Sequence, residues 1–190
     1  MQMRVFISVN LSALARKELG ELTQKLQKSH WPVRWEKPEK IHVTFTFLGE
    51  LKNLRTEKLK NILEKACSGI KPFTISFKGL GAFPDFVQPR VVWVGLKGDL
   101  KSLAALQKGI EKELKKAGIW FDKKPFTPHV TIGRVKKGIS KGYLLDLGKK
   151  IKKLRQIDFQ SRILVDSVEI MKSDLLPGDS VYTELAKIKF

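Results

Sequence analysis

The chain contains very little cysteine: Cys67 is the only one among 190 residues. A single thiol excludes an internal disulfide and any zinc site built from several cysteines. Cys67 falls in a segment where a helix should pack, so we expect a buried, structural thiol. The cysteine content therefore offers neither a cross-link nor cysteine-based metal chemistry.

Long apolar runs are also absent. No stretch approaches the roughly 20 residues that a helix needs to cross a bilayer. The N-terminus runs directly into an alternating strand, without the basic start and apolar core of a secretory signal. We therefore expect a cytoplasmic protein with no membrane partner.

Acidic residues are scarce relative to basic ones. The chain has 37 Lys and Arg against 19 Asp and Glu, which gives a formal net charge of +18 and a pI near 10.0. The positive residues are spread along the whole chain, so the surface of the folded protein should be basic. A polyanion, most commonly nucleic acid, is the partner that this balance predicts. The alternative is a lysine-rich surface that only keeps the protein soluble.

Histidine is scarce as well, yet two of the three histidines lie in the same short pattern. His-Val-Thr occurs within residues 41–50 and again within residues 128–134, each time in a β-branched or aromatic run typical of a strand. Because side chains alternate along a strand, His42, Thr44 and Thr46 should share one face. The other face should carry Ile41, Val43, Phe45 and Phe47.

The second copy follows the same rule, with His129 and Thr131 on one face. The opposite face should carry Val130 and Ile132. If the two strands are neighbours, their polar faces form a cleft with two imidazoles and two hydroxyls. Strict alternation turns Arg134 away from His129, and Arg134 reaches the cleft only if the strand bulges or ends at Gly133.

Two imidazoles that lie on opposite sides of one phosphorus atom can divide acid–base catalysis between them. Histidine, with an ordinary pKa of roughly 6.5, works as acid or base near neutral pH. One ring would take a proton from the attacking water and the other would protonate the departing oxygen, while the threonine hydroxyls stabilise phosphate oxygens. This scheme needs no metal ion. Three histidines, one cysteine and no tight cluster of acids with histidine leave too few ligands for a two-metal phosphodiesterase, and Asp122, the nearest acid before His129, is a single carboxylate.

A blander interpretation exists for each of these pieces. A single His-x-Thr on a strand is usually only a polar outer face, and it is the second copy that favours catalysis. His30, beside Trp31 and Pro32, is expected at a helix end on the surface. Trp93 is most simply a core residue.

Two aromatic side chains lie in an irregular, proline-containing segment at residues 83–90. Buried aromatics are less expected in a loop. We therefore expect Phe83 or Phe86 to stack on a nucleic-acid base.

Strands and helices alternate irregularly along the chain. Apolar periodicity predicts strands at residues 3–9, 41–50, 71–81, 91–96, 128–134, 159–170 and 181–190, the last two joined by a loop with Pro177 and Gly178. Helices are predicted after Ser12 as N-cap, across residues 59–66, from Asp99 to Gly118, and around residues 144–154. Residues 35–40 and 120–127 are predicted connectors.

This order favours an α+β fold with mainly antiparallel sheets. Each His-Val-Thr copy is preceded by a helix and an irregular connector, which suggests internal duplication. We expect one domain over residues 1–190 with two pseudo-symmetric lobes, each a mainly antiparallel sheet with helices, on either side of a central cleft.

The paired motif resembles that of the two-histidine (2H) phosphoesterases. The first copy continues into Phe-Leu-Gly, and the second is set in Pro-His-Val-Thr-Ile-Gly-Arg. The segments MRVFISVNL, FPDFVQPRVVWVGL and MKSDLLPGDSVYTEL are similar to the RNA 2′,3′-cyclic phosphodiesterases, historically called 2′-5′ RNA ligases. The resemblance implies a two-lobed α+β structure and metal-independent opening of an RNA-terminal 2′,3′-cyclic phosphate to a 2′-phosphate.

The resemblance also implies roles for residues. It makes His42 and His129 catalytic, and it makes Thr44, Thr131 and Arg134 phosphate-binding. A 2′-phosphate product requires water to attack phosphorus and the 3′-oxygen to leave. We take His129 as proton acceptor and His42 as proton donor, but the two motifs are too alike for the sequence to exclude the reverse order. The expected substrate is RNA with a cyclic phosphate end, tRNA being one candidate, and the expected enzyme is a monomer without cofactor.

Two other functions remain open. A 2′-5′ RNA ligase that joins tRNA half-molecules would use the same histidines, although the chain lacks the glycine-rich phosphate loop of an ATP-driven ligase. A non-catalytic RNA-binding protein would owe its affinity to charge alone. In that case His42→Ala and His129→Ala would leave salt-dependent binding largely unchanged.

Overall fold

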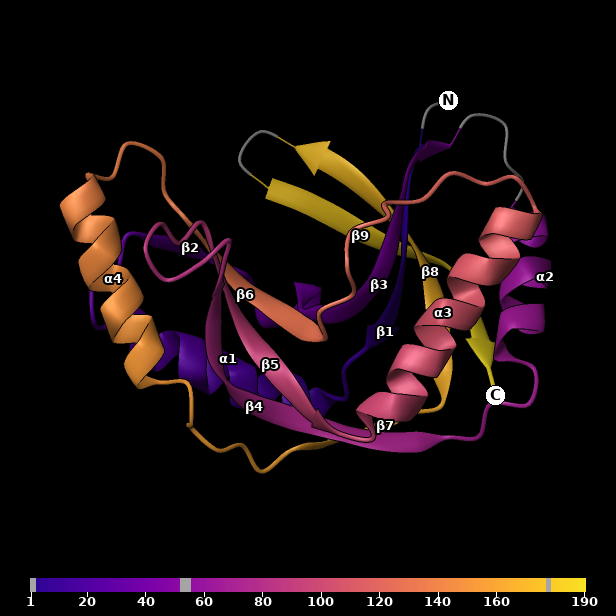
Figure 1. The fold of residues 1–190 in the computed structure, drawn as a ribbon, viewed down its shortest axis with the longest axis horizontal. Helices are drawn as coiled ribbons and strands as arrows, with labels where there is room; N and C mark the ends of the chain where they lie inside the picture. Colours follow the sequence, from indigo (N-terminus) through magenta and orange to yellow (C-terminus); the bar gives the residue numbers. More distant parts are fainter. Residues whose placement is uncertain (1–2, 52–55, 177–178) are drawn as a thin grey trace.

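The computed structural model describes residues 3–51, 56–176 and 179–190 (Figure 1). The described strands are β1 (Met3–Asn10), β2 (Val33–Trp35), β3 (His42–Leu51), β4 (Phe73–Phe83), β5 (Val91–Gly98), β6 (His129–Val135), β7 (Arg162–Val165), β8 (Ser167–Leu176) and β9 (Asp179–Lys189). The helices are α1 (Ala13–Gln27), α2 (Thr56–Cys67), α3 (Leu100–Lys116) and α4 (Lys141–Lys153), with a short 3₁₀ helix η1 (Pro38–Lys40).

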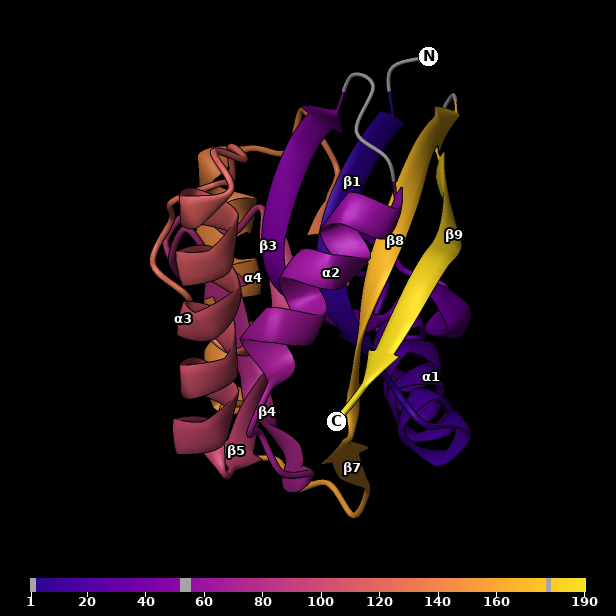
Figure 2. The same ribbon diagram turned by 90° about the vertical axis from the view of Figure 1, so that its right-hand side faces the viewer.

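The described strands form one antiparallel sheet that curls on itself (Figures 1 and 2). Its order is β7-β4-β5-β6-β3-β1-β8-β9, and β2 pairs with β6. The predicted α+β fold with antiparallel pairing is confirmed, but the prediction of a separate sheet for each lobe is wrong. The two halves join where Val43 of β3 pairs with Val130 of β6. Since these are the middle residues of the two His-Val-Thr copies, the motifs lie side by side.

The helices lie along the outside of the curl, with α2 beside α3 at one end and α4 at the other (Figures 1 and 2). The predicted N-caps are present: Ser12 Oγ accepts from the Ala15 N–H at 3.2 Å, and Asp99 accepts from the Ser102 N–H at 2.9 Å. The predicted apolar faces of α2 and α3 are buried; they comprise Leu59, Ile62, Leu63 and Ala66, and Leu103, Leu106, Ile110 and Leu114. Burial of these faces holds the helices against the sheet, and each large apolar side chain contributes about 1.5–3 kcal/mol to the stability of the fold.

Cys67 ends α2 and is buried, as predicted. Burial raises the pKa of its thiol to about 12. The thiol therefore stays protonated near neutral pH, which fits a packing role.

The C-terminal strands divide differently from the prediction. The single strand expected at residues 159–170 is two strands, β7 and β8, separated at Asp166, and β8 continues to Leu176. The break has a topological reason, because β7 pairs with β4 at one edge of the sheet whereas β8 pairs with β1 in the other half. The predicted loop residues Pro177 and Gly178 lie outside the described residues.

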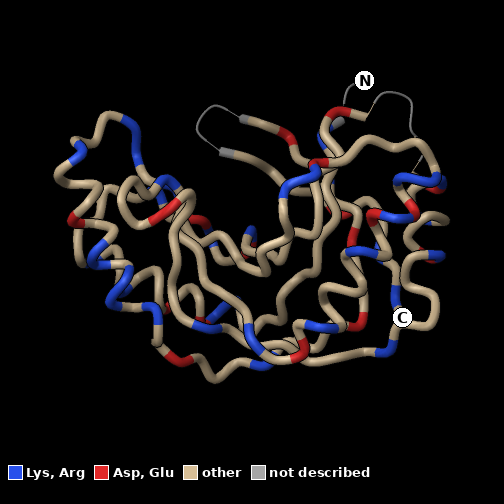
Figure 3. Tube along the Cα trace, in the orientation of Figure 1, with Lys and Arg blue, Asp and Glu red and all other residues tan. Residues whose placement is uncertain are grey.

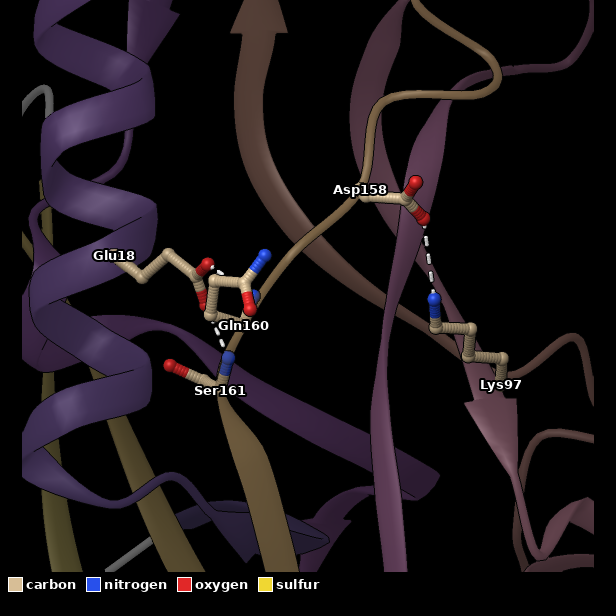
Figure 4. A network of polar contacts seen from close by, with 5 residues as sticks. All are labelled: Glu18, Lys97, Asp158, Gln160 and Ser161. Atoms are coloured by element: carbon tan, nitrogen blue, oxygen red, sulfur yellow. Dashed lines mark hydrogen bonds and ion pairs between the residues drawn. The ribbon is translucent and has the colours of Figure 1, made fainter.

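A polar network holds the segment that carries the chain from α4 back to β7 (Figure 4). Glu18 of α1 accepts hydrogen bonds from the backbone N–H groups of Gln160, at 2.6 Å, and Ser161, at 3.0 Å. Lys97 of β5 donates to Asp158 at 3.2 Å. A carboxylate that accepts two backbone bonds is a strong anchor, so α1 and β5 together fix the entry into β7.

Lys and Arg residues occur along the chain at both ends of the molecule (Figure 3). The last turns of α3 and α4 are rich in lysine: Lys115 and Lys116 in α3, and Lys150, Lys152 and Lys153 in α4. The positive charge is thus spread over the folded surface, as the sequence predicts. None of the helices in the described residues is long and apolar enough to cross a membrane.

Candidate active site

The first histidine strand contains a bulge directly after its threonine. Thr44 of β3 pairs with Ser8 of β1, and Thr46 pairs with Ile7, so Phe45 has no partner of its own. An extra residue of this kind reverses the alternation of side chains beyond it. The face that carries Thr44 therefore does not carry Thr46.

This bulge overturns two expectations from strict alternation. Thr46 is buried, at 4% exposure, and its hydroxyl donates to the Asp122 carbonyl at 3.4 Å instead of joining His42. Phe47, expected in the core, is 51% exposed. The strand thus presents an aromatic ring on the histidine face where a hydroxyl was predicted.

The second histidine strand repeats the bulge at the equivalent position. Thr131 of β6 pairs with Trp93 of β5, and Gly133 pairs with Val92, which leaves Ile132 unpaired. Arg134 is thereby shifted to the same face as Thr131. From the sequence, Arg134 was expected to reach the cleft only if the strand bulged or ended at Gly133, and this bulge meets that condition.

Gly133 makes room for the neighbouring strand β2. A Cβ atom on this glycine would lie 2.5 Å from Val33 Cγ1 and 3.0 Å from Trp35 Cε3. Such distances are far below van der Waals contact, so a side chain here would displace β2. The glycine therefore keeps β2 against β6 directly beside Arg134.

A cleft of about 320 Å³ opens over the junction of the two motifs. The five residues predicted to be catalytic or phosphate-binding all line it: His42, Thr44, His129, Thr131 and Arg134. Because the strands run antiparallel through the Val43–Val130 pair, His42 lies on the side of Thr131 and Thr44 on the side of His129. The remaining lining residues are Glu36, Lys40, Phe47, Phe83, Val91, Lys124 and Tyr182.

Each of the two imidazoles is oriented by a hydrogen bond to the backbone carbonyl two residues before it. Nδ1 of His42 lies 2.7 Å from the carbonyl O of Lys40, and Nδ1 of His129 lies 2.6 Å from the carbonyl O of Thr127. A carbonyl oxygen can only accept, so Nδ1 carries the proton in each ring. In the neutral imidazole Nε2 then holds the lone pair, which is the form that can accept a proton.

Burial shifts both histidines toward the neutral state. Desolvation lowers the pKa of His42 to about 4, against the raising effect of the Lys40 carbonyl, and the charges of Arg16 and His129 make smaller lowering contributions. Desolvation also lowers the pKa of His129, against the raising effect of the Thr127 carbonyl. Both rings are therefore neutral near pH 7 in the free protein.

Aromatic rings account for the desolvation of His42. Phe6 of β1 stacks on it, with ring centroids 4.7 Å apart and planes at 24°. Tyr182 of β9 meets the imidazole edge-on at 5.4 Å. These two rings cover the imidazole from strands far apart in the sequence.

His129 has aromatic neighbours of its own, from β4 and β5. Phe83 lies edge-on to it at 4.9 Å, and Trp93 lies 5.9 Å away. Trp93, expected in the core, is only half-buried. Phe86 is not among the cleft-lining residues and instead faces Arg155, whose guanidinium lies 5.9 Å from the ring centroid. Of the two predicted stacking residues, only Phe83 is in the site.

Several lining residues were missed by the sequence prediction. Lys124 lies in the predicted lysine-rich connector, whose composition was a usable signal. Tyr182, and Phe6, which stacks on His42 without lining the cleft, gave no such signal, because only the sheet order β3-β1-β8-β9 brings their strands to this side of the site.

The lining favours an anion, with three cationic residues, Lys40, Lys124 and Arg134, against one acid, Glu36. Nε of Arg134 lies 3.5 Å from Glu36, and Lys124 pairs with Asp122 at 2.8 Å. Arg134 and Lys124 are 52% and 85% exposed at their side chains, so both remain open to a ligand. In the described part of the chain, no group of three or more His, Cys, Asp or Glu residues could hold a metal ion.

Comparison with known proteins agrees with the motif. The model of the 2′-5′ RNA ligase superfamily matches residues 17–175. The RNA 2′,3′-cyclic phosphodiesterase of Thermotoga maritima is 32% identical over 189 residues, covering 99% of this chain and 96% of the relative. That of Methanothermobacter thermautotrophicus is 29% identical over 185 residues, covering 97% of each chain.

Solved structures share the fold. The crystal structure of TT0787 from Thermus thermophilus superposes with a TM-score of 0.77 at 26% identity, covering 98% of this chain and 97% of that one. E. coli LigT complexed with 3′-AMP has a TM-score of 0.75 at 20% identity, covering 100% and 98%. The paired motifs, the family match and the full-length relatives establish that this chain belongs to the 2′-5′ RNA ligase superfamily of two-histidine phosphoesterases, within the RNA 2′,3′-cyclic phosphodiesterase family.

Proposed function

We propose that the protein hydrolyses an RNA-terminal 2′,3′-cyclic phosphate to a 2′-phosphomonoester, without a metal ion, using His42 and His129 as acid and base. The observation that carries this proposal is the shared cleft, in which two imidazoles, two threonines and an arginine meet. The relatives named above are RNA 2′,3′-cyclic phosphodiesterases, which favours hydrolysis over ligation as the reaction.

The proposed reaction is a single displacement at phosphorus. Nε2 of His129 takes a proton from water while the water oxygen forms a bond to phosphorus. The bond between phosphorus and the 3′-oxygen breaks, its electron pair stays on that oxygen, and Nε2 of His42 supplies the proton. The products are a 2′-phosphate and a free 3′-hydroxyl.

Because both histidine pKa values are lowered, substrate binding must raise the pKa of the imidazole that acts as the acid. Both rings are neutral in the free protein, so the acid needs a proton on Nε2 before it can donate. A bound phosphodiester supplies a negative charge, which raises the pKa of a nearby imidazole. Substrate binding thus prepares His42 as the donor, and we expect the pH optimum of kcat/KM to lie below 6.5.

Thr44, Thr131 and Arg134 are assigned to the phosphate oxygens. Hydroxyls and a guanidinium donate to charge that grows on non-bridging oxygens in the transition state. Phe83 offers its ring to the terminal base. We further propose that residues 1–190 form one domain with two pseudo-symmetric lobes, supported by the equivalent bulges and by the Val43–Val130 pair at the sheet centre.

A defined oligonucleotide with a 2′,3′-cyclic phosphate end, incubated in EDTA, tests the activity. We expect wild type to yield a product with one phosphomonoester end, and His42→Ala and His129→Ala to leave the end intact while binding the RNA as before. Joined oligonucleotides as the main product would favour ligation. Salt-dependent binding with no change at the end would favour the non-catalytic alternative.

The assignment of acid and base has its own test. A substrate with sulfur in place of the 3′-oxygen has a leaving group that needs little protonation. This sulfur should restore much of the activity of His42→Ala and little of that of His129→Ala. The opposite pattern would exchange the two roles.

A further inference from the structure

A second cavity of about 320 Å³ continues from the cleft. Its walls are built by β1, β3, β8 and β9, and the side chains found only here include Arg4, Ser173, Leu175 and Ser180. Three residues, Phe47, Arg134 and Tyr182, line both cavities. The two spaces are therefore adjoining parts of one surface.

The chemistry of this cavity suits a nucleotide. Arg4 offers a guanidinium whose side chain is 51% exposed, and Ser173 and Ser180 bring hydroxyl groups. Leu175, 58% exposed, and Phe47, 51% exposed, provide apolar surface on which a base can lie. Exposed apolar side chains between cations are suited to an anion that carries a flat ring.

The shared wall indicates how a ligand would pass from one space to the other. Arg134, on the boundary, follows the bulge in β6, and Phe47 follows the bulge in β3. A guanidinium and an aromatic ring thus lie at the boundary between the two cavities. In a ligand that occupied both cavities, the phosphate that joins the two nucleosides would lie at this boundary. Resting on the proposed function, we propose that this cavity is a subsite for the nucleotide that precedes the cyclic phosphate.

Covalent chemistry fixes which neighbour this is. In a terminal 2′,3′-cyclic phosphate the 2′- and 3′-oxygens of the ribose are both bonded to phosphorus, so the RNA continues only through the 5′-oxygen. A subsite next to the cleft can therefore be reached only by the nucleotide on the 5′ side. The substrate class that follows is an oligonucleotide end, and not a free mononucleotide.

The groove formed by Trp31, Arg34 and Trp35 is a weaker candidate for the chain path. Although it is larger, at about 690 Å³, it shares no lining residue with the cleft. The continuity through Phe47 and Arg134 favours the second cavity.

The test compares uridine 2′,3′-cyclic phosphate with the dinucleotide that carries one further uridine on its 5′ side. Wild type should turn over the dinucleotide with a kcat/KM about tenfold higher. Arg4→Gln should lower kcat/KM for the dinucleotide about fivefold to tenfold and leave the mononucleotide unchanged, because it removes a contact to the internucleotide region. Leu175→Glu, which adds a repelling charge to the wall, should act in the same direction.

Two matched variants separate binding from stability and from overall charge. Arg4 pairs with Glu50 at 3.3 Å, so Glu50→Gln breaks the same ion pair while keeping the arginine, and it should not impair the dinucleotide reaction. Arg162→Gln removes one exposed arginine from β7, at the other edge of the sheet, and it should have no selective effect.

The outcomes are distinct. Equal kcat/KM for the two substrates in wild type, or an equal loss on both in Arg4→Gln, would overturn the subsite while the hydrolase remains. A loss in Glu50→Gln or Arg162→Gln as large as that in Arg4→Gln would also overturn it. Turnover of neither substrate by wild type would instead refute the proposed function, and the subsite with it.

Discussion

β3 and β6 carry the same His-Val-Thr triplet and the same bulge one residue later, yet they deliver different side chains after it. In β3 the side chain is Phe47, and in β6 it is Arg134. The imidazoles differ as well: His42 is stacked against Phe6, and its pKa falls to about 4, whereas Phe83 meets His129 only edge-on. The same bulge thus places an apolar ring on one side of the cleft and a cationic side chain on the other.

The difference teaches that the two halves need not do the same work. The triplet and the bulge set the positions of imidazole and hydroxyl. The residues around them set the protonation state and the charge. An asymmetric reaction, with one acid and one base, can therefore arise on two strands that share the His-Val-Thr triplet and the bulge.

The largest effect is expected from removing either imidazole. His42→Ala and His129→Ala should each lower kcat by about 10²–10⁴-fold, because each removes one proton-transfer group. Steady-state kinetics on a cyclic-phosphate oligonucleotide measures this. If one variant kept nearly full activity, the halves would not share the reaction.

The pH dependence of the free energy of unfolding tests the buried imidazole of His42. The native pKa of His42 is about 4 against 6.5 for an unfolded histidine, so the unfolded state binds more protons between these values. Stability is therefore full above pH 6.5 and falls as the pH drops toward 4, by about 3 kcal/mol at most for this group. The free energy of unfolding, measured by urea denaturation across this range, should vary less steeply with pH in His42→Gln than in wild type. Equal slopes in wild type and His42→Gln would mean that His42 titrates normally.

Arg134 tests the cationic half. Arg134→Gln should lower kcat/KM about tenfold to a hundredfold, and Arg134→Lys should lose less, because the charge stays but the bidentate fork is lost. Glu36→Gln is the matched control, since it frees the arginine from its partner and should not reduce activity. An Arg134→Gln variant with wild-type kinetics would leave Arg134 without a part in the reaction.

The smallest effects are expected on the free energy of unfolding, at the two positions that follow the motif threonines by two residues, Gly133 and Thr46. Gly133→Ala should lower the free energy of unfolding by about 1–3 kcal/mol, since its Cβ would overlap Val33. Thr46→Ala loses only a long hydrogen bond and should cost about 1 kcal/mol or less. Urea midpoints report both values, and a larger cost for Thr46→Ala would reverse this ranking.

The sequence predicts the elements and the motif better than it predicts the faces. Alternation places His42, Thr44, His129 and Thr131 correctly because it operates only across two residues. Beyond the bulges it fails: Phe45 and Ile132 are ordinary strand residues, and nothing in their type marks an unpaired position. Only for Arg134 did a glycine at position 133 signal that the strand could change course.

Neighbours in space were harder to predict than neighbours in sequence. The single continuous sheet depends on the pairing of β3 with β6, which amounts to one residue pair. Phe6 and Tyr182 reach His42 only through the order β3-β1-β8-β9. Periodicity identifies a strand, but it does not identify the strand beside it.

The most direct measurement is phosphorus NMR of an RNA 2′,3′-cyclic phosphate incubated with the protein in ¹⁸O-labelled water and EDTA. His42→Ala and His129→Ala are run beside the wild type. We expect conversion to a 2′-phosphate alone, carrying one ¹⁸O atom, and no conversion in either variant. A 3′-phosphate product would show that the 2′-oxygen leaves, and full conversion by either variant would contradict the two-histidine mechanism.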